Sequence, residues 1–298
     1  MTSPPGAAAP PGPVARWIEG ARPRTLPAAV VPVLVGTMAV RPSEILWGRM
    51  VLAGVVALAV QIGTNYANDY SDGIRGTDEV RVGPIRLVGQ RLASPKAVKA
   101  AAFASFGIAA VAGLVLCAVA GWWLVLVGAA AIGAGWLYTG GPRPYGYLGL
   151  GEVFVFVFFG IVATAGSAYV QHRSVPAIAW IASVSVGLLA TALLEANNLR
   201  DIDGDVTAHK RTLAVRLGRQ RAGWLFVGSY VGAALGIIAC GFLRPTALIA
   251  LVGLVAAVPS CRLALSPSTG RELLPMLKAS GRAQLLVGGL LALGLAWG

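Results

Sequence analysis

The sequence contains few charged residues. Only 12% of its 298 positions are Asp, Glu, Lys or Arg, while 56% are hydrophobic and the mean hydropathy is +0.73. A soluble globular domain usually carries about 25% charged residues. The composition therefore argues against a soluble domain and indicates that the chain folds in a lipid bilayer.

Apolar stretches recur along nearly the whole chain, and each is roughly 17 to 25 residues, about long enough to cross a ~30 Å hydrocarbon core as a helix. They predict an all-α, polytopic transmembrane helical bundle. The first stretch contains Pro27 and Pro32, which membrane helices tolerate. We expect about nine spans, at approximately 25–40, 48–68, 98–118, 121–138, 150–171, 176–197, 222–241, 245–261 and 281–298.

Cysteine is also scarce. Cys117, Cys240 and Cys261 all fall inside or at the ends of apolar spans, where cysteine behaves as a small buried hydrophobe, so no disulfide or metal framework is predicted. The first thirteen residues are rich in Pro, Ala and Gly and lack the basic segment and apolar core of a signal peptide. We expect a disordered cytoplasmic tail over 1–15 and a single transmembrane domain over 16–298.

The net charge of +12 raises the question of nucleic-acid binding, but the basic residues are distributed as in a membrane protein. If the predicted spans alternate from a cytoplasmic N-terminus, 20 of the 24 Lys and Arg residues fall on the cytoplasmic side. Such a bias follows the positive-inside rule and favours an odd number of spans. We therefore expect a multi-pass protein of the cell inner or plasma membrane that contacts lipid and binds no nucleic acid.

Acidic residues number 12 against 24 basic ones, and seven of the twelve lie in two short windows at the cytoplasmic ends of predicted spans. The first window holds Asp69, Asp72, Asp78 and Glu79, and the second holds Asp201, Asp203 and Asp205. Carboxylates at membrane depth are costly, so they mark a pathway, a relay or a bound ion. A solvated helix end with polar caps is the simpler alternative for either window alone.

Each window places its polar side chains one helical turn apart. Asn65, Asp69 and Asp72 are spaced i, i+4 and i+7 and share a helix face, before Gly73 and Gly76 end the helix and free Asp78 to fold back. The second window repeats the spacing with Asn197, Asn198, Asp201 and Asp205. Such clusters offer the hard oxygen ligands that suit Mg²⁺. Two facing clusters could clamp a diphosphate between metal ions.

A weak internal repeat connects the two windows. Asn65-x₃-Asp69 recurs as Asn197-x₃-Asp201, and each is followed by an Arg-rich stretch, 86–91 and 216–221. A pseudo-twofold bundle with its site at the interface between the repeats is a known arrangement in membrane proteins. The repeat therefore favours one shared site formed by both windows.

These residues resemble the UbiA superfamily of intramembrane prenyltransferases, which has nine transmembrane helices and two Asp-rich motifs. Asn68-Asp69-x₂-Asp72 and Asp201-x₃-Asp205 match those motifs directly. The chain departs from the pattern at Asp78, which lies six residues past Asp72 where many members have four. The resemblance implies an enzyme that uses Mg²⁺ and a polyprenyl diphosphate.

Within the superfamily, the likeness is strongest to the branch that prenylates 1,4-dihydroxy-2-naphthoate, with loss of CO₂, in menaquinone synthesis. It runs from about residue 17 to the end, and its last three spans are generic. Prenylation of 4-hydroxybenzoate is the alternative within the superfamily. The stretches that carry the likeness are 22–27, 65–72, 138–146, 149–152 and 197–213.

The two windows and the family resemblance together indicate a role for each candidate residue. Magnesium ligands are expected at Asp69, Asp72, Asp78, Asp201 and Asp205, with Asn65 and Asn68 as neutral ligands or orienting groups. Arg143, Lys210 and Arg211 are expected to contact phosphate oxygens, although Arg143 lies one position later than the basic residue of the family's Tyr-x₃-Lys element. Tyr138, with Tyr66 or Tyr70 as alternatives, would stabilise an allylic cation through its ring.

Two classes outside the enzymes remain open at this point. A secondary transporter also pairs Asp and Asn clusters, but usually near the membrane midplane. A quinone- or lipid-binding structural subunit has no use for seven clustered acids. Prenyl chain length and oligomeric state leave no signature in the sequence.

Overall fold

The computed structural model describes residues 12–77 and 85–298, and every regular element in those ranges is helical. The fold is therefore an all-α bundle, as predicted. The α-helices are α1 (Pro13–Gly20), α2 (Pro27–Met38), α3 (Trp47–Ile74), α4 (Pro95–Ala120), α5 (Leu124–Leu137), α6 (Gly151–Val155), α7 (Ala163–His172), α8 (Ala177–Thr207), α9 (Leu213–Gly241), α10 (Ala250–Gly253), α11 (Val258–Leu265) and α12 (Leu274–Trp297).

Seven helical segments among the described residues are long and apolar enough to cross a membrane. Helices α6 and α7 form one such segment through a π-helix at Phe156–Val162, and α10 and α11 belong to another. Helices α2 and α5 have only 12 and 14 residues, which corresponds to about 18 and 21 Å. The nine predicted spans therefore correspond to seven full-length segments and two short ones.

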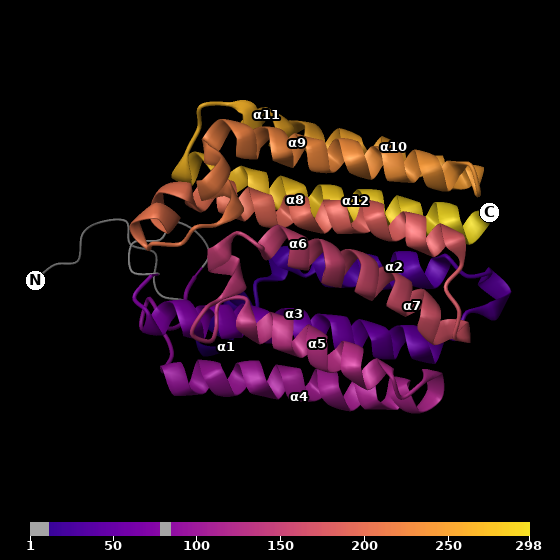
Figure 1. Cartoon of the computed structure of the whole chain (residues 1–298), viewed down its shortest axis with the longest axis horizontal. Helices are drawn as coiled ribbons and strands as arrows, with labels where there is room; N and C mark the ends of the chain where they lie inside the picture. The colour runs from indigo at the N-terminus through magenta and orange to yellow at the C-terminus, as the bar shows by residue number, and fades with distance from the viewer. Residues whose placement is uncertain (1–11, 78–84) are drawn as a thin grey trace, which may run out of the picture.

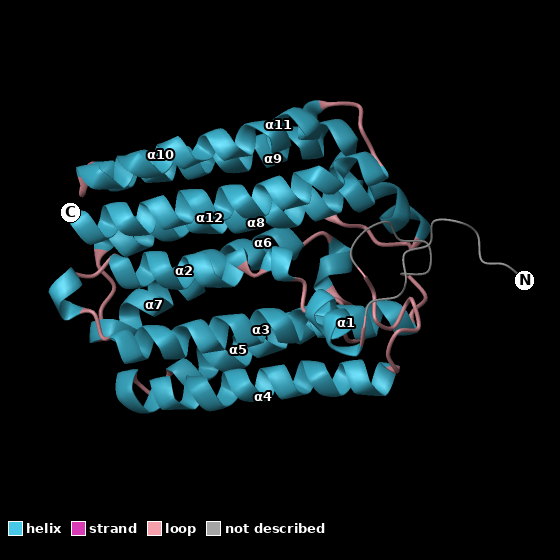
Figure 2. Ribbon diagram, turned by 180° about the vertical axis from the view of Figure 1, so that it is seen from behind, coloured by secondary structure: helices cyan, strands magenta, loops and turns pink. Residues whose placement is uncertain are grey.

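The helices run side by side along the long axis of the molecule, and the first described helix, α1, lies at the end opposite to the C-terminus (Figure 1). Both views give the same order of layers (Figure 2): α9 to α11, then α8 with α12, then α2 with α6 and α7, then α3 with α5, and finally α4. A described chain that begins with α1 at one end and finishes at the other agrees with an odd number of passes. We call the end at which α3 and α8 finish, beside α1, the polar end.

Large apolar side chains on the outside of the bundle are exposed, among them Phe103, Val111, Leu126 and Phe242. A soluble protein rarely exposes so much apolar surface, whereas lipid is a suitable solvent for it. Inside, small residues bring the helices close together: a Cβ added at Gly36 of α2 would collide with the Thr164 carbonyl oxygen of α7. This close packing through small residues is typical of helices in membranes.

The predicted boundary between the N-terminal tail and the membrane domain can be compared with the structure only from residue 12 onward. Helix α1 begins at Pro13, so it includes the last three residues of the segment for which we expected disorder. Residues 1–11 lie outside the described residues. Asp78 and Glu79 of the first acidic window also lie outside them, and the metal-ligand role expected of Asp78 stays a prediction.

Candidate active site

A cavity of about 790 Å³ lies between the α3–α5 layer and helices α2, α7 and α8. Most of its polar side chains gather at the polar end and come from both halves of the chain, among them Arg22, Asn65, Asn68, Asp72, Arg86, Tyr147, Asn197, Asn198, Arg200, Asp205 and Lys210. The remaining wall is mostly apolar and reaches Leu116, Leu124 and Val170, near the opposite end of the bundle. The cavity can hold a molecule with a charged head and a long apolar tail.

The first acidic window supplies Asn68 and Asp72 to this cavity from the last turns of α3. The Asn68 amide oxygen accepts a 2.7 Å hydrogen bond from the Thr139 hydroxyl. Asn65 also lines the cavity, but its amide nitrogen donates to the Ala21 carbonyl at 2.9 Å and to the Thr25 hydroxyl at 3.1 Å. Asn65 therefore fixes the turn that carries Arg22 into the site.

Asp69 is fully buried and points away from the cavity lining. One of its carboxylate oxygens accepts the Leu87 N–H at 2.8 Å, and the other accepts the Val88 N–H at 2.9 Å. Charge-assisted bonds of this kind are stronger than neutral ones. In this structure Asp69 anchors the segment after the acidic window and does not face the site where we predicted a metal.

In the second acidic window, too, one carboxylate lines the cavity and another pairs with a neighbouring group. Asp205 lines the cavity, and one of its oxygens lies 3.4 Å from the Thr212 hydroxyl. Both oxygens of Asp201 accept from the Arg200 guanidinium at 2.7 Å, and the side chain of Arg200 is the one that lines the cavity. Of the four acids compared, Asp72 and Asp205 line the cavity, whereas Asp69 and Asp201 each hold another group of the chain.

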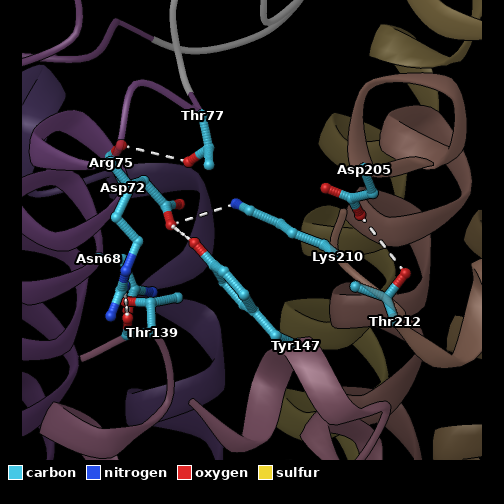
Figure 3. Close-up of polar contacts among 9 residues, drawn as sticks. All are labelled: Asn68, Asp72, Arg75, Thr77, Thr139, Tyr147, Asp205, Lys210 and Thr212. Atoms are coloured by element: carbon cyan, nitrogen blue, oxygen red, sulfur yellow. Dashed lines mark hydrogen bonds and ion pairs between the residues drawn. The ribbon is translucent and has the colours of Figure 1, made fainter. Parts of the chain in front are cut away.

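The two halves of the site meet at Asp72 (Figure 3). The Lys210 ammonium lies 3.1 Å from Oδ1 of Asp72, and the Tyr147 hydroxyl donates to the same oxygen at 2.7 Å. Lys210 follows α8, whereas Tyr147 belongs to a 3₁₀ turn at Tyr145–Leu148. Burial raises the pKa of Tyr147, with the nearby Asp72 charge adding to the effect, so the phenol keeps its proton and remains the donor.

Three tyrosines were candidates for stabilising a cation, and only Tyr138 lines the cavity. Burial, followed by the Glu152 charge, raises its pKa, so the phenol is neutral. Tyr66 donates its hydroxyl to the Trp17 carbonyl at 2.8 Å. Tyr70 stacks on Trp136 with ring centroids 6.2 Å apart. Tyr66 and Tyr70 thus serve packing around α3.

The basic residues of the site differ from those expected. Lys210 lines the cavity as predicted, but Arg143 and Arg211 are exposed and do not. The cavity instead takes its guanidinium groups from other arginines. These are Arg22, Arg24, Arg86 and Arg200. Three of the four, Arg22, Arg24 and Arg200, belong to stretches that carry the family likeness, and that likeness could have identified them. Tyr147 had no sequence signal of its own, except that it directly follows the 138–146 stretch.

The oxygen donors suit a hard divalent cation. Asp72, Asp205 and the Asn68 amide offer carboxylate and carbonyl oxygens at one end of one cavity, which are the ligand types of Mg²⁺. Within 12–77 and 85–298, no three His, Cys, Asp or Glu side chains converge as a protein cage would require. Mg²⁺ is commonly held by one or two carboxylates together with substrate phosphates, so the residues present fit that mode.

Solved structures with the same arrangement support the fold. A UbiA homolog from Archaeoglobus fulgidus bound to DMAPP and Mg²⁺ aligns with a TM-score of 0.66 at 14% identity, covering 95% of this chain and 99% of that one. An apo UbiA homolog from Aeropyrum pernix K1 aligns with a TM-score of 0.66 at 17% identity, covering 91% and 96%. At these low sequence identities, the likeness shows a shared fold and nothing more.

Sequence relatives are much closer. The 1,4-dihydroxy-2-naphthoate octaprenyltransferase of Mycobacterium tuberculosis is 47% identical over 285 residues, covering 94% of this chain and 98% of that protein. The enzyme of the same name from Escherichia coli is 39% identical, covering 74% and 75%. Residues 29–271 match the UbiA prenyltransferase family. The aspartate windows, the membrane bundle and these relatives agree that the chain belongs to the UbiA prenyltransferase family.

Proposed function

We propose that this protein transfers a polyprenyl group from polyprenyl diphosphate to 1,4-dihydroxy-2-naphthoate, releasing diphosphate and CO₂, in menaquinone synthesis. The observation that carries the proposal is a single cavity with acids and cations at one end and a long apolar wall beyond. A polyprenyl diphosphate has the same division of polarity. The two relatives named above, at 47% and 39% identity, supply the choice of acceptor.

We assign metal binding to Asp72 and Asp205, with Asn68 as a neutral ligand and diphosphate oxygens completing the shell. Mg²⁺ bound there would neutralise the charge that develops on the departing diphosphate. Asp69 and Asp201 act as positioning residues in this assignment, because Asp69 holds the segment at Leu87 and Asp201 holds Arg200. Asp78 lies outside the described residues and remains a further candidate ligand.

Fixed cations of the chain complete the diphosphate site. Four basic side chains line the polar end of the cavity: Lys210, Arg22, Arg86 and Arg200. Arg200 is fixed in direction by Asp201, which engages its Nε and one terminal nitrogen. Preorganised cations of this kind stabilise a leaving group without having to reorganise during the reaction.

The bonds change in a balanced way. The allylic C–O bond breaks and its electron pair leaves with the diphosphate. The ring carbon that bears the carboxylate then forms the new C–C bond, and the electron pair released with CO₂ restores aromaticity, giving demethylmenaquinol, the reduced form of demethylmenaquinone. The neutral ring of Tyr138 lines the cavity and can stabilise the allylic cation through its π face.

Carboxyl-labelled acceptors test this function directly. Purified protein supplied with Mg²⁺, a polyprenyl diphosphate and labelled 1,4-dihydroxy-2-naphthoate should release one labelled CO₂ and one diphosphate for each prenyl transfer. 4-Hydroxybenzoate, which is prenylated at an adjacent carbon and keeps its carboxylate, should not react. Turnover of 4-hydroxybenzoate alone would move the chain to the other acceptor class. A protein that releases no diphosphate with either acceptor would favour a transporter.

The site should open on the cytoplasmic side, because the basic residues concentrate around it. Single cysteines at Gln90 and Gln220, both exposed at the polar end, should react with an impermeant thiol reagent only from the cytoplasm. A cysteine at Ser174, exposed beyond the other end of α7, should react only from outside. The background lacks Cys117, Cys240 and Cys261. The reverse labelling pattern would invert the proposed topology.

A further inference from the structure

One carboxylate oxygen of the proposed metal site is already engaged by two groups of the chain. Oδ1 of Asp72 lies 3.1 Å from the Lys210 ammonium and 2.7 Å from the Tyr147 hydroxyl. The side chains of Lys210 and Asp72 are only 7% and 3% exposed. A divalent cation that takes this oxygen must therefore share it with a buried ammonium or displace that ammonium.

The position of Lys210 is set by the surrounding chain. Its backbone N–H donates to the Asp205 carbonyl at 2.8 Å, and the next N–H, of Arg211, donates to the Tyr147 carbonyl at 3.0 Å. The ammonium also lies over the Tyr147 ring, 4.7 Å from its centroid, a cation–π contact. Lys210 is thus held between the two proposed metal-binding carboxylates, within the cavity wall (Figure 3).

We propose that Lys210 competes with the divalent cation for Asp72 and transfers to the diphosphate when metal and diphosphate arrive together. This inference rests on the proposed function. Two cations at one oxygen repel each other strongly in a buried site, because charges interact more strongly away from water. A diphosphate provides several anionic oxygens to which the Lys210 ammonium can bind when the metal displaces it from the Asp72 carboxylate.

Competition has a thermodynamic consequence. Metal alone must break the Lys210–Asp72 pair and leave the ammonium without this partner, which is costly for a buried charge. Metal with diphosphate avoids that cost, so each ligand raises the affinity for the other. The enzyme therefore favours the metal–diphosphate complex over free metal, and Lys210 is the residue that produces this preference.

The test measures binding in the full-length protein without turnover. Mn²⁺, which accepts the same oxygen ligands as Mg²⁺, is titrated alone and followed by its electron paramagnetic resonance signal. Inorganic pyrophosphate is titrated separately at saturating Mg²⁺. Lys210→Met should bind Mn²⁺ alone about tenfold more tightly and pyrophosphate about tenfold more weakly than the wild-type protein. Lys99→Met, which removes an exposed charge from α4 near the same end, should change neither affinity beyond about twofold.

Tighter Mn²⁺ binding combined with weaker pyrophosphate binding in Lys210→Met distinguishes this proposal from its alternatives. A Lys210 that only contacts phosphate would leave Mn²⁺ binding unchanged, and one that only supports the fold would weaken both ligands; either result overturns the proposal. If the wild-type protein binds neither Mn²⁺ nor pyrophosphate, the proposed function itself fails. If Lys210→Met does not fold, Lys210→Arg tests the proposal instead. A bidentate guanidinium binds the Asp72 carboxylate more strongly than an ammonium does, so it should compete better with the metal. The affinity of this variant for Mn²⁺ alone must fall below that of wild type, and equal or tighter binding would refute the competition.

Discussion

Asp72→Asn should lower the rate of prenyl transfer by about a thousandfold, the upper range for the loss of one preorganised charge-stabilising group. The substitution keeps the shape of the side chain and an oxygen that can accept from the Tyr147 hydroxyl. It removes the negative charge that Asp72 offers to a divalent cation and to Lys210. Steady-state rates with saturating naphthoate and prenyl diphosphate, compared at several Mg²⁺ concentrations, measure the effect.

The acidic window of α8 provides a matched control. Asp203 is exposed and does not line the cavity, although it stands between Asp201 and Asp205 in the sequence. Asp203→Asn removes the same charge from the same end of the bundle and should change the rate by less than about twofold, since a surface charge contributes little. Equal losses in the two variants would mean that net charge, and not a defined ligand, governs the rate.

Helical periodicity explains why part of the site was predictable. Successive residues of an α-helix are rotated by about 100°, so relative to Asn65 the side chain of Asp72 lies at about −20°, Asn68 at about −60° and Asp69 at about +40°. The cavity lining includes Asn65, Asn68 and Asp72, which covers the negative side of this arc. Asp69 falls on the other side, toward Leu87 and Val88. Spacing alone had placed Asn65, Asp69 and Asp72 together on one face.

The remaining parts of the site depend on contacts between distant segments. Tyr147 reaches Asp72 from a turn whose Tyr147 carbonyl accepts the Arg211 N–H, and Arg22 enters the cavity from a left-handed backbone conformation with φ of 55°. Neither feature has a periodic signal in the sequence. The apolar spans were predictable because burial in lipid leaves a long, continuous pattern, whereas a turn is decided by the residues against which it packs.

Asp69→Asn should separate an anchoring role from the metal-binding role that the sequence indicated. The Asp69 carboxylate accepts two backbone N–H groups and has no exposed surface. An asparagine presents an NH₂ group to one of those donors, so one buried N–H loses its acceptor. The loss of a charge-assisted bond together with an unsatisfied donor should destabilise the protein by about 2–4 kcal/mol. Thermal unfolding in detergent, without added metal, measures the change.

The same substitution should release the segment that contains Leu87 and Val88. Both side chains are buried against α3, and the adjacent Arg86 lines the cavity with only 5% of its surface exposed. Cleavage by trypsin after Arg86 should therefore become faster, and prenyl transfer should fall by about a hundredfold as this cation leaves the diphosphate site. Asp72→Asn should lower the rate without accelerating this cleavage. If Asp69→Asn instead keeps the wild-type unfolding temperature and cleavage rate but no longer binds Mn²⁺, then Asp69 turns toward the metal in the working enzyme, and the ligand set inferred from helical spacing is the correct one.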